Sequence, residues 1–195
     1  MDYAALISLA FVSSITPGPN NLMLWASGLN HGIRRSVPHL LGVSAGFTVL
    51  LFLIATGLGT VFDRYESVAL LLKVLGGGYL SYLAYRIFTA SSTGRSTEAA
   101  PPLTFLQAAL FQWVNPKAWV MGTTAVSTLL DTERPILQAA LLIVGPFWVV
   151  NLPCILAWLW SGAASSRVLD DPRRLRVATR SLGVLLGATV VLIVS

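Results

Sequence analysis

The sequence predicts an all-α membrane protein in which six transmembrane helices form two inverted three-helix repeats. Of the 195 residues, 55% are hydrophobic and only 11% are charged, with a mean hydropathy of +0.73, whereas a soluble domain has about 25% charged residues. Apolar runs of roughly 20 residues, the length that crosses a bilayer, recur along the chain. Two of them carry matching proline motifs, which predicts that the first and fourth helices are broken. These observations exclude a soluble domain and a disordered chain.

Six apolar runs give the predicted spans, which are residues 3–29, 37–62, 65–88, 103–130, 135–161 and 175–195. The first, second and fifth runs contain no Asp, Glu, Lys or Arg, and the fourth contains only Lys117. Runs of this length predict helices, because barrel strands alternate in polarity over about ten residues.

Basic residues are unevenly distributed between the predicted loops. The second and fourth loops hold only Arg64 and Arg134. The odd loops hold eight, which are Arg34, Arg35, Arg86, Arg95, Arg167, Arg173, Arg174 and Arg176. Because basic loops stay in the cytoplasm, we expect both termini outside, in the periplasm. The net charge of +5 then reflects membrane topology, and no nucleic-acid partner is expected.

The organisation predicted is a single integral membrane domain over residues 1–195. Its first three-helix repeat covers 1–90, a polar cytoplasmic linker covers 91–102, and the second repeat covers 103–195. Three spans per half place the second half upside down relative to the first. At an offset of 99 residues, Thr16-Pro17 matches Asn115-Pro116 and Gly46 matches Gly145. Inverted repeats of this kind are typical of transporters.

The proline motifs predict where the functional site lies. A proline inside a helix deprives the carbonyl four residues earlier of its donor. The prolines at 17, 19 and 116 therefore free the carbonyls of Ser13, Ile15 and Gln112. An unpaired backbone group in hydrocarbon costs several kcal/mol, so such breaks need partners from protein, water or a ligand. Simple kinks in packed helices are the alternative interpretation.

Both motifs also read as helix starts, since Thr16 and Asn115 are good N-cap types and each precedes a proline. Inverted topology brings the two restarting helices together near the bilayer midplane from opposite directions. Their N–H groups suit a carboxylate, and the carbonyls of the preceding half-helices suit an ammonium. We therefore expect a site for a zwitterion.

The segment Thr16-Pro17-Gly18-Pro19-Asn20 resembles the signature of the LysE/RhtB family of bacterial amino-acid exporters. Asn115-Pro116-Lys117-Ala118 resembles its second motif, and Lys73, Gly76 and Gly78-Tyr79-Leu80 resemble its third-span pattern, with Ala84 where that pattern usually has glycine. The resemblance covers the whole chain. It implies an exporter of amino acids or close derivatives in the bacterial inner membrane, driven by the proton gradient.

The predicted substrate-binding residues are Thr16, Pro17, Gly18, Pro19, Asn20, Asn115, Pro116, Lys117, Trp119 and Asn151. Lys117 and Lys73 are the candidates for proton coupling, because an ionisable residue inside a membrane is costly and usually functional. Each of four residues also has a structural role as its alternative. Lys117 could pair with freed carbonyls, and Lys73 could snorkel outward. Trp119 could pack in the core, and Asn151 could form a hydrogen bond across helices. Trp158 fits an interfacial aromatic belt.

All eight acidic residues lie at span ends or in loops. A divalent metal site would need buried carboxylates, His or thiolates, and Cys154 is the only cysteine. We therefore expect no metal and no cofactor, and a neutral rather than basic amino acid as substrate. The other expected partners are protons and the lipid bilayer. The oligomeric state stays open, and a homo-oligomer is one option.

A channel or scaffold, an exporter of another substrate and an intramembrane enzyme remain as alternatives. A channel or scaffold could use the same six spans without active transport, and the fold could export another small solute or a metal ion. An intramembrane enzyme would need Ser44 with His39, since Gly42 to Gly46 matches the GxSxG pattern of hydrolases. That pattern requires a strand–turn–helix elbow, so we expect close helix packing there and no enzyme activity.

Overall fold

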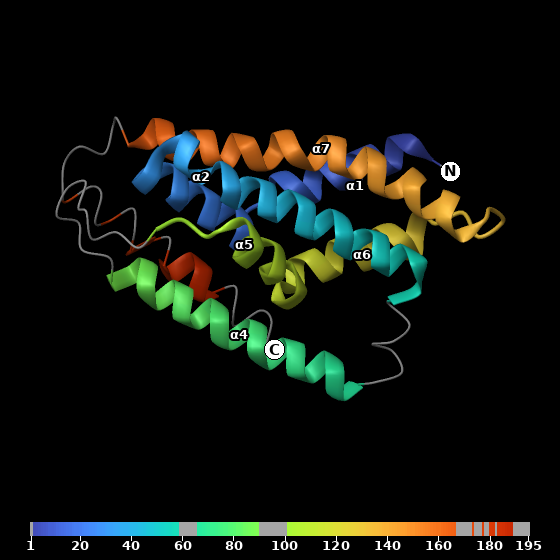
Figure 1. Ribbon diagram of the computed structural model, residues 1–195, viewed down its shortest axis with the longest axis horizontal. Helices are drawn as coiled ribbons and strands as arrows, with labels where there is room; N and C mark the ends of the chain where they lie inside the picture. The colour runs from blue at the N-terminus through green and yellow to red at the C-terminus, as the bar shows by residue number, and fades with distance from the viewer. Residues whose placement is uncertain are drawn as a thin grey trace.

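The computed structural model of the protein describes residues 2–58, 66–89, 101–166, 173, 177, 180–181 and 183–188. All regular elements in these ranges are helical (Figure 1). Within them, Pro19–Leu58 and Ile136–Ser165 are long and apolar enough to cross a membrane, and Tyr3–Ile15 and Phe105–Val114 are shorter apolar helices. The all-α class is thereby confirmed, whereas six spans in two inverted repeats stay a prediction.

The first predicted span is broken as expected, into α1 (Tyr3–Ile15) and the beginning of α2 (Pro19–Leu53). The expected N-cap was wrong: Thr16 is the C-cap of α1, and Gly18 is the N-cap of α2. The reason is that a residue before proline avoids the helical region. Both Thr16 and Gly18 precede a proline and are extended, so the helix restarts only at Pro19.

The chain reverses within α2 at Gly32, whose φ of 73° lies in the left-handed region that favours glycine. Ser27 Oγ donates to Ser36 Oγ over 2.7 Å, although residues nine apart in a straight helix would be about 13.5 Å apart. The part of α2 before Gly32 therefore belongs to the first predicted span. The part after it belongs to the second predicted span and continues into a π-helical turn, η1 (Ile54–Leu58).

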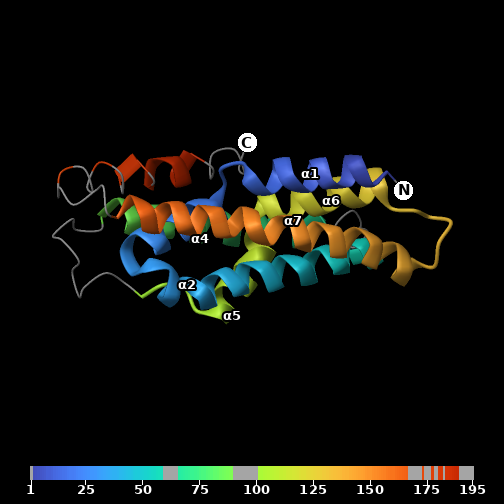
Figure 2. The same ribbon diagram turned by 90° about the horizontal axis from the view of Figure 1, so that it is seen from above.

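The second half of the chain shows the same kind of break. Helix α5 (Phe105–Phe111) tightens into the 3₁₀ turn η2 (Gln112–Val114), and α6 (Pro116–Leu129) follows after Asn115. The break predicted in the fourth span is therefore confirmed. Helix α7 (Ile136–Ser165) runs between α1 and α2 and contacts both (Figure 2).

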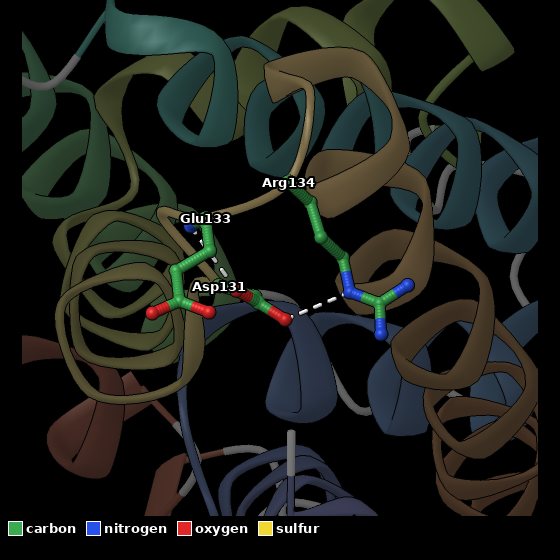
Figure 3. A network of polar contacts seen from close by, with 3 residues as sticks. All are labelled: Asp131, Glu133 and Arg134. Carbon is green, nitrogen blue, oxygen red and sulfur yellow. Dashed lines mark hydrogen bonds and ion pairs between the residues drawn. The ribbon is translucent and has the colours of Figure 1, made fainter.

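The turn between α6 and α7 is held by Asp131 (Figure 3). Its carboxylate accepts hydrogen bonds from the Glu133 backbone N–H at 3.2 Å and from Arg134 Nε at 2.7 Å. The hydrogen bond from Arg134 holds the pKa of Asp131 below its ordinary value.

Helix α4 (Glu66–Thr89) runs along one side of the bundle (Figure 1). A Cβ on Gly76 would overlap the carbonyl oxygen of Val114, so this glycine allows α4 to lie directly on the second break. Of the sixth predicted span, the described residues 177, 180–181 and 183–188 are helical. Residues 91–100 of the predicted linker (91–102) and the end of the chain, 189–195, lie outside the described residues.

Close glycine contacts explain the hydrolase-like pattern in α2. A Cβ on Gly42 would overlap the carbonyl oxygen of Phe105, and one on Gly46 would lie 2.6 Å from Ala109 Cα. Both glycines therefore bring α2 against the backbone of α5, which confirms the packing interpretation. His39 is 2% exposed, and neither of its ring nitrogens has a hydrogen-bond partner among the described residues. It is therefore not hydrogen-bonded to Ser44.

Large apolar side chains face outward on the described helices. Examples are Phe11 and Val12 on α1, Leu106 on α5, Val120 on α6 and Val149 on α7, each more than half exposed. A water-soluble surface seldom carries so many exposed apolar side chains, whereas lipid tails accommodate them. The surface thus fits a helical membrane protein.

Candidate functional site

The two helix breaks, about one hundred residues apart in the sequence, lie against each other. Asn20 Nδ2 donates to Gln112 Oε1 at 2.8 Å, and Gln112 Nε2 donates back to Asn20 Oδ1 at 3.1 Å. Lys117 Nζ donates to the carbonyl oxygen of Thr16 at 2.7 Å. The two proline motifs therefore lie together, and they form the candidate site.

Each carbonyl that a proline frees at these breaks has found a donor. Ser13 O accepts from the Thr16 hydroxyl at 3.0 Å. Ile15 O accepts from Trp158 Nε1 at 3.0 Å. Gln112 O accepts from the Asn115 backbone N–H at 3.3 Å. Because an unpaired backbone group is costly in a membrane, these bonds make the breaks stable structures rather than defects.

The Lys117 ammonium donates three hydrogen bonds at the site. It donates to Thr16 O at 2.7 Å, to the Thr16 hydroxyl at 3.0 Å and to Pro17 O at 3.3 Å. These oxygens lie at the C-terminal end of α1, where the helix dipole is negative. Lys117 thus pairs with backbone carbonyls in this structure, but these are the carbonyls of Thr16 and Pro17 and not the three that the prolines free.

Gly18 provides the space through which the Lys117 side chain reaches those oxygens. A Cβ on Gly18 would lie 2.6 Å from Lys117 Cδ and 3.1 Å from Nζ. Its φ of −176° is ordinary extended backbone, so the need for glycine here is steric and comes from the lysine.

The two restarting helices differ in how their first N–H groups are bonded. At α6, Asn115 Oδ1 accepts from Lys117 N at 3.2 Å, and Asn115 O accepts from Ala118 N at 3.0 Å and Trp119 N at 3.4 Å. The expectation of free N–H groups at α6 was therefore wrong, because its own cap residue takes them. Helix α2 has Gly18 at its N-cap and no side-chain cap, so an anion would find its donors at α2.

A small cavity lies where the breaks meet. Its polar lining comprises Ser13, Ser14, Asn20, Asn21, Asn115, Lys117 and Asn151, beside Gly18. Its apolar lining comprises Val43, Phe47, Ala118, Met121 and Ile155. The cavity volume is about 30 Å³, room for about two water molecules and too small for an amino acid. No carboxylate lies among these lining residues.

Five of the ten predicted binding residues line this cavity: Gly18, Asn20, Asn115, Lys117 and Asn151. Thr16 and Pro17 contact the Lys117 ammonium, and Pro19 and Pro116 begin α2 and α6. Trp119 lies outside the lining and donates from Nε1 to Trp113 O at 2.9 Å. Lys73 belongs to α4, and its side chain lies outside the described part of the structure.

Sequence reasoning missed one side chain that holds the site together, that of Gln112. Gln112 was considered only for its carbonyl, yet its side chain is fully buried and pairs with Asn20. Asn21 Nδ2 donates to Ser14 O and Thr16 O, both at 2.8 Å. A polar amide within an apolar run is the signal that could have identified Gln112.

Two further contacts come from α7. Asn151 Nδ2 donates to Ser14 Oγ at 2.9 Å, which ties the middle of α7 to the end of α1. Trp158, expected in an interfacial belt, bonds Ile15 O at the break. The freed carbonyl of Ile15 thus gives the indole N–H a partner inside the protein, and the interfacial position of Trp158 stays a prediction.

Comparison with known proteins relates the chain to membrane translocators and efflux proteins. The family model described as LysE type translocator matches residues 11–194. The cysteine/O-acetylserine efflux protein of Klebsiella pneumoniae subsp. pneumoniae is 29% identical over 154 residues, covering 79% of this chain and 74% of that protein. The protein of the same name from Escherichia coli K12 is 31% identical over 157 residues, covering 80% and 75%. No solved structure matches the chain significantly.

Proposed function

The chain belongs to the LysE type translocator family, and we propose that it exports a small neutral amino acid or a close derivative across the bacterial inner membrane. Its relatives are named as efflux proteins for cysteine and O-acetylserine, which are both small amino acids without a charged side chain. The observation that carries the proposal is the polar cavity at the meeting point of two broken helices, an arrangement typical of transporter sites.

The polarity of the site supports a zwitterionic substrate. The carbonyls of Thr16 and Pro17 are acceptors for an ammonium group. The N-terminus of α2, which no side chain caps, offers donors for a carboxylate next to the positive charge of Lys117. Because no carboxylate lines the cavity, a basic side chain on the substrate would lack a counter-charge, which favours neutral substrates.

We further propose alternating access around this site, with one three-helix repeat rocking against the other. A cavity of about 30 Å³ is too small for an amino acid, so binding would require the two halves to move apart. The Asn20–Gln112 pair and the Lys117–Thr16 contact join the first half of the chain to the second. Opening toward either side of the membrane would break or rearrange them. Export is coupled to protons in this proposal, with Lys117 and Lys73 as the candidate carriers.

The test is efflux from inverted membrane vesicles or cells preloaded with labelled neutral and basic amino acids, with and without an uncoupler. We expect uncoupler-sensitive efflux of a neutral amino acid such as cysteine or O-acetylserine. It should be lost in Asn115→Ala and in Lys117→Ala. Val120→Ala serves as the matched control, because Val120 lies on the same helix and is 63% exposed.

Immunoblots of the membranes must show equal amounts of each variant. Efflux that is unaffected by the uncoupler and does not saturate would favour the channel alternative. Preferred efflux of lysine or arginine would contradict the neutral-substrate proposal.

A further inference from the structure

We propose that Lys117 is a tethered cation that occupies the substrate's ammonium subsite in the empty transporter and is displaced when substrate binds. The ammonium subsite is defined here by three oxygens, the carbonyls of Thr16 and Pro17 and the hydroxyl of Thr16. The inference rests on the proposed function, because it assigns this subsite to a transported amino acid. It adds two statements to that function. The substrate must carry a free ammonium and a free carboxylate, and Lys117 occupies the ammonium subsite when no substrate is bound.

The geometry of the subsite matches a primary ammonium. Such a group has three N–H donors and no acceptor, and Lys117 Nζ has one oxygen within 3.3 Å for each donor. The α-ammonium of an amino acid has the same three donors. The lysine therefore shows which ligand group the three oxygens accept.

The contact is also one that a ligand can exchange. All three partners are neutral oxygens, so no opposite full charge holds the lysine in place. Thr16 and Pro17 are exposed and Lys117 is half-buried. Its flexible four-carbon stem passes over Gly18. The ammonium can thus leave while the backbone of the break stays unchanged.

Two ammonium groups cannot share these oxygens, because like charges at hydrogen-bonding distance repel. A bound substrate ammonium must therefore displace Lys117 Nζ. The displaced charge remains beside Gly18, at the N-terminus of α2, where we placed the substrate carboxylate. The carboxylate then compensates the charge that its own ammonium has displaced.

This exchange predicts that the substrate must carry both charges. A ligand whose amine is acylated has no ammonium to enter the subsite, so Lys117 stays in place. A ligand whose carboxylate is esterified displaces Lys117 but leaves its charge without a partner. The substrate class is therefore an amino acid with a free primary ammonium and a free carboxylate.

The first test uses the fact that the chain has only two lysines, Lys73 and Lys117. Protein labelled with [¹⁵Nζ]lysine gives two side-chain NMR signals, and Lys73→Arg identifies the signal of Lys117. The probes are reduced L-cysteine, N-acetyl-L-cysteine and L-cysteine methyl ester. We expect L-cysteine to shift the Lys117 signal at concentrations at least tenfold lower than either derivative. Equal shifts with L-cysteine and N-acetyl-L-cysteine would overturn the proposal.

The second test needs no amino acid and so separates this inference from the proposed function. In Lys117→Ala the subsite is empty, and ethylammonium can fill it. At ten times its dissociation constant, ethylammonium should raise the Tm of Lys117→Ala by about 3 °C or more. The wild type and Val120→Ala, whose subsites hold the lysine, should not respond. Equal effects on all three proteins, or none on Lys117→Ala, would overturn the proposal.

The two kinds of failure give different results. If no amino acid is exported but ethylammonium stabilises only Lys117→Ala, the subsite stands and the proposed function fails. If amino acids are exported while the Lys117 signal is unmoved by saturating L-cysteine, the function stands and the displacement fails. Should Lys117→Ala not fold, Lys117→Met takes its place, and the NMR measurement on the wild type decides independently of both variants.

Discussion

The reciprocal amide pair between Asn20 and Gln112 predicts a measurable energetic coupling between the two halves of the chain. Its two hydrogen bonds, of 2.8 and 3.1 Å, join residues 92 apart, and the Gln112 side chain is fully buried. Gln112→Leu keeps the approximate volume but leaves the Asn20 amide without its partner. An interhelical hydrogen bond in a membrane protein contributes about 0.6 to 1.7 kcal/mol, so the pair is worth about 1–2 kcal/mol.

The assay is thermal unfolding of the purified protein in detergent, arranged as a double-mutant cycle with Asn20→Leu and Gln112→Leu. For a chain of this size, 1 kcal/mol shifts Tm by about 2–4 °C, so Gln112→Leu should lower Tm by about 2–8 °C. The double variant should lose about 1–2 kcal/mol less than the sum of the single variants, because removing both partners leaves no unpaired amide.

Gln107→Leu is the matched control for this cycle. Gln107 lies on α5, which continues directly into the η2 turn of Gln112, but it is exposed and its side chain accepts from the Thr104 backbone N–H in a capping box. Its replacement should be additive with Asn20→Leu. Strict additivity of the Asn20 and Gln112 replacements as well would refute the reasoning, since the pair would then contribute nothing beyond its separate parts.

Three further predictions follow from individual contacts. Gly18→Ala should weaken export while changing Tm little, because the new Cβ would lie 2.6 Å from Lys117 Cδ and push that side chain aside; Gly145→Ala, with nothing within 4 Å of its Cβ, should export normally. Trp158→Phe should cost about 1–3 kcal/mol in unfolding experiments, because Ile15 O loses its donor, whereas Trp160→Phe on the exposed face should cost little. Arg134→Ala should raise the pKa of Asp131 toward its ordinary value in a carboxyl NMR titration, because Arg134 lowers it. The stabilisation from that bond is present at neutral pH and is lost as the pH falls through the lowered pKa of Asp131; an unchanged titration would contradict this.

The positions of the helix breaks could be predicted from the sequence because proline acts locally. Proline disfavours a continuing helix but does not always end one, since Pro38, Pro146 and Pro153 lie inside α2 and α7. The breaks around Pro17 and Pro116, where a cap-type residue precedes the proline, are found where expected. The cap at Thr16 failed for an equally local reason. With prolines at 17 and 19, the residue before each one is extended, and only the second proline can start α2.

The partners of the broken ends could not be predicted, because they depend on tertiary packing. Ile15 bonds Trp158, which is 143 residues away, and Asn20 bonds Gln112, which is 92 away. The spacing of residues along one helix carries no information about such contacts. The sequence could indicate that freed carbonyls need donors, but only the packed structure identifies which side chains supply them.

We propose that the two breaks form the binding site of a carrier for a small neutral amino acid. Counterflow tests it most directly, with purified protein in liposomes that contain a high concentration of unlabelled L-cysteine or O-acetyl-L-serine and receive a trace of the labelled compound outside. We expect a transient accumulation of label above its equilibrium level in the wild type and in Val120→Ala, and none in Lys117→Ala. Entry of label to equilibrium without an overshoot, or the same overshoot in Lys117→Ala, would contradict it.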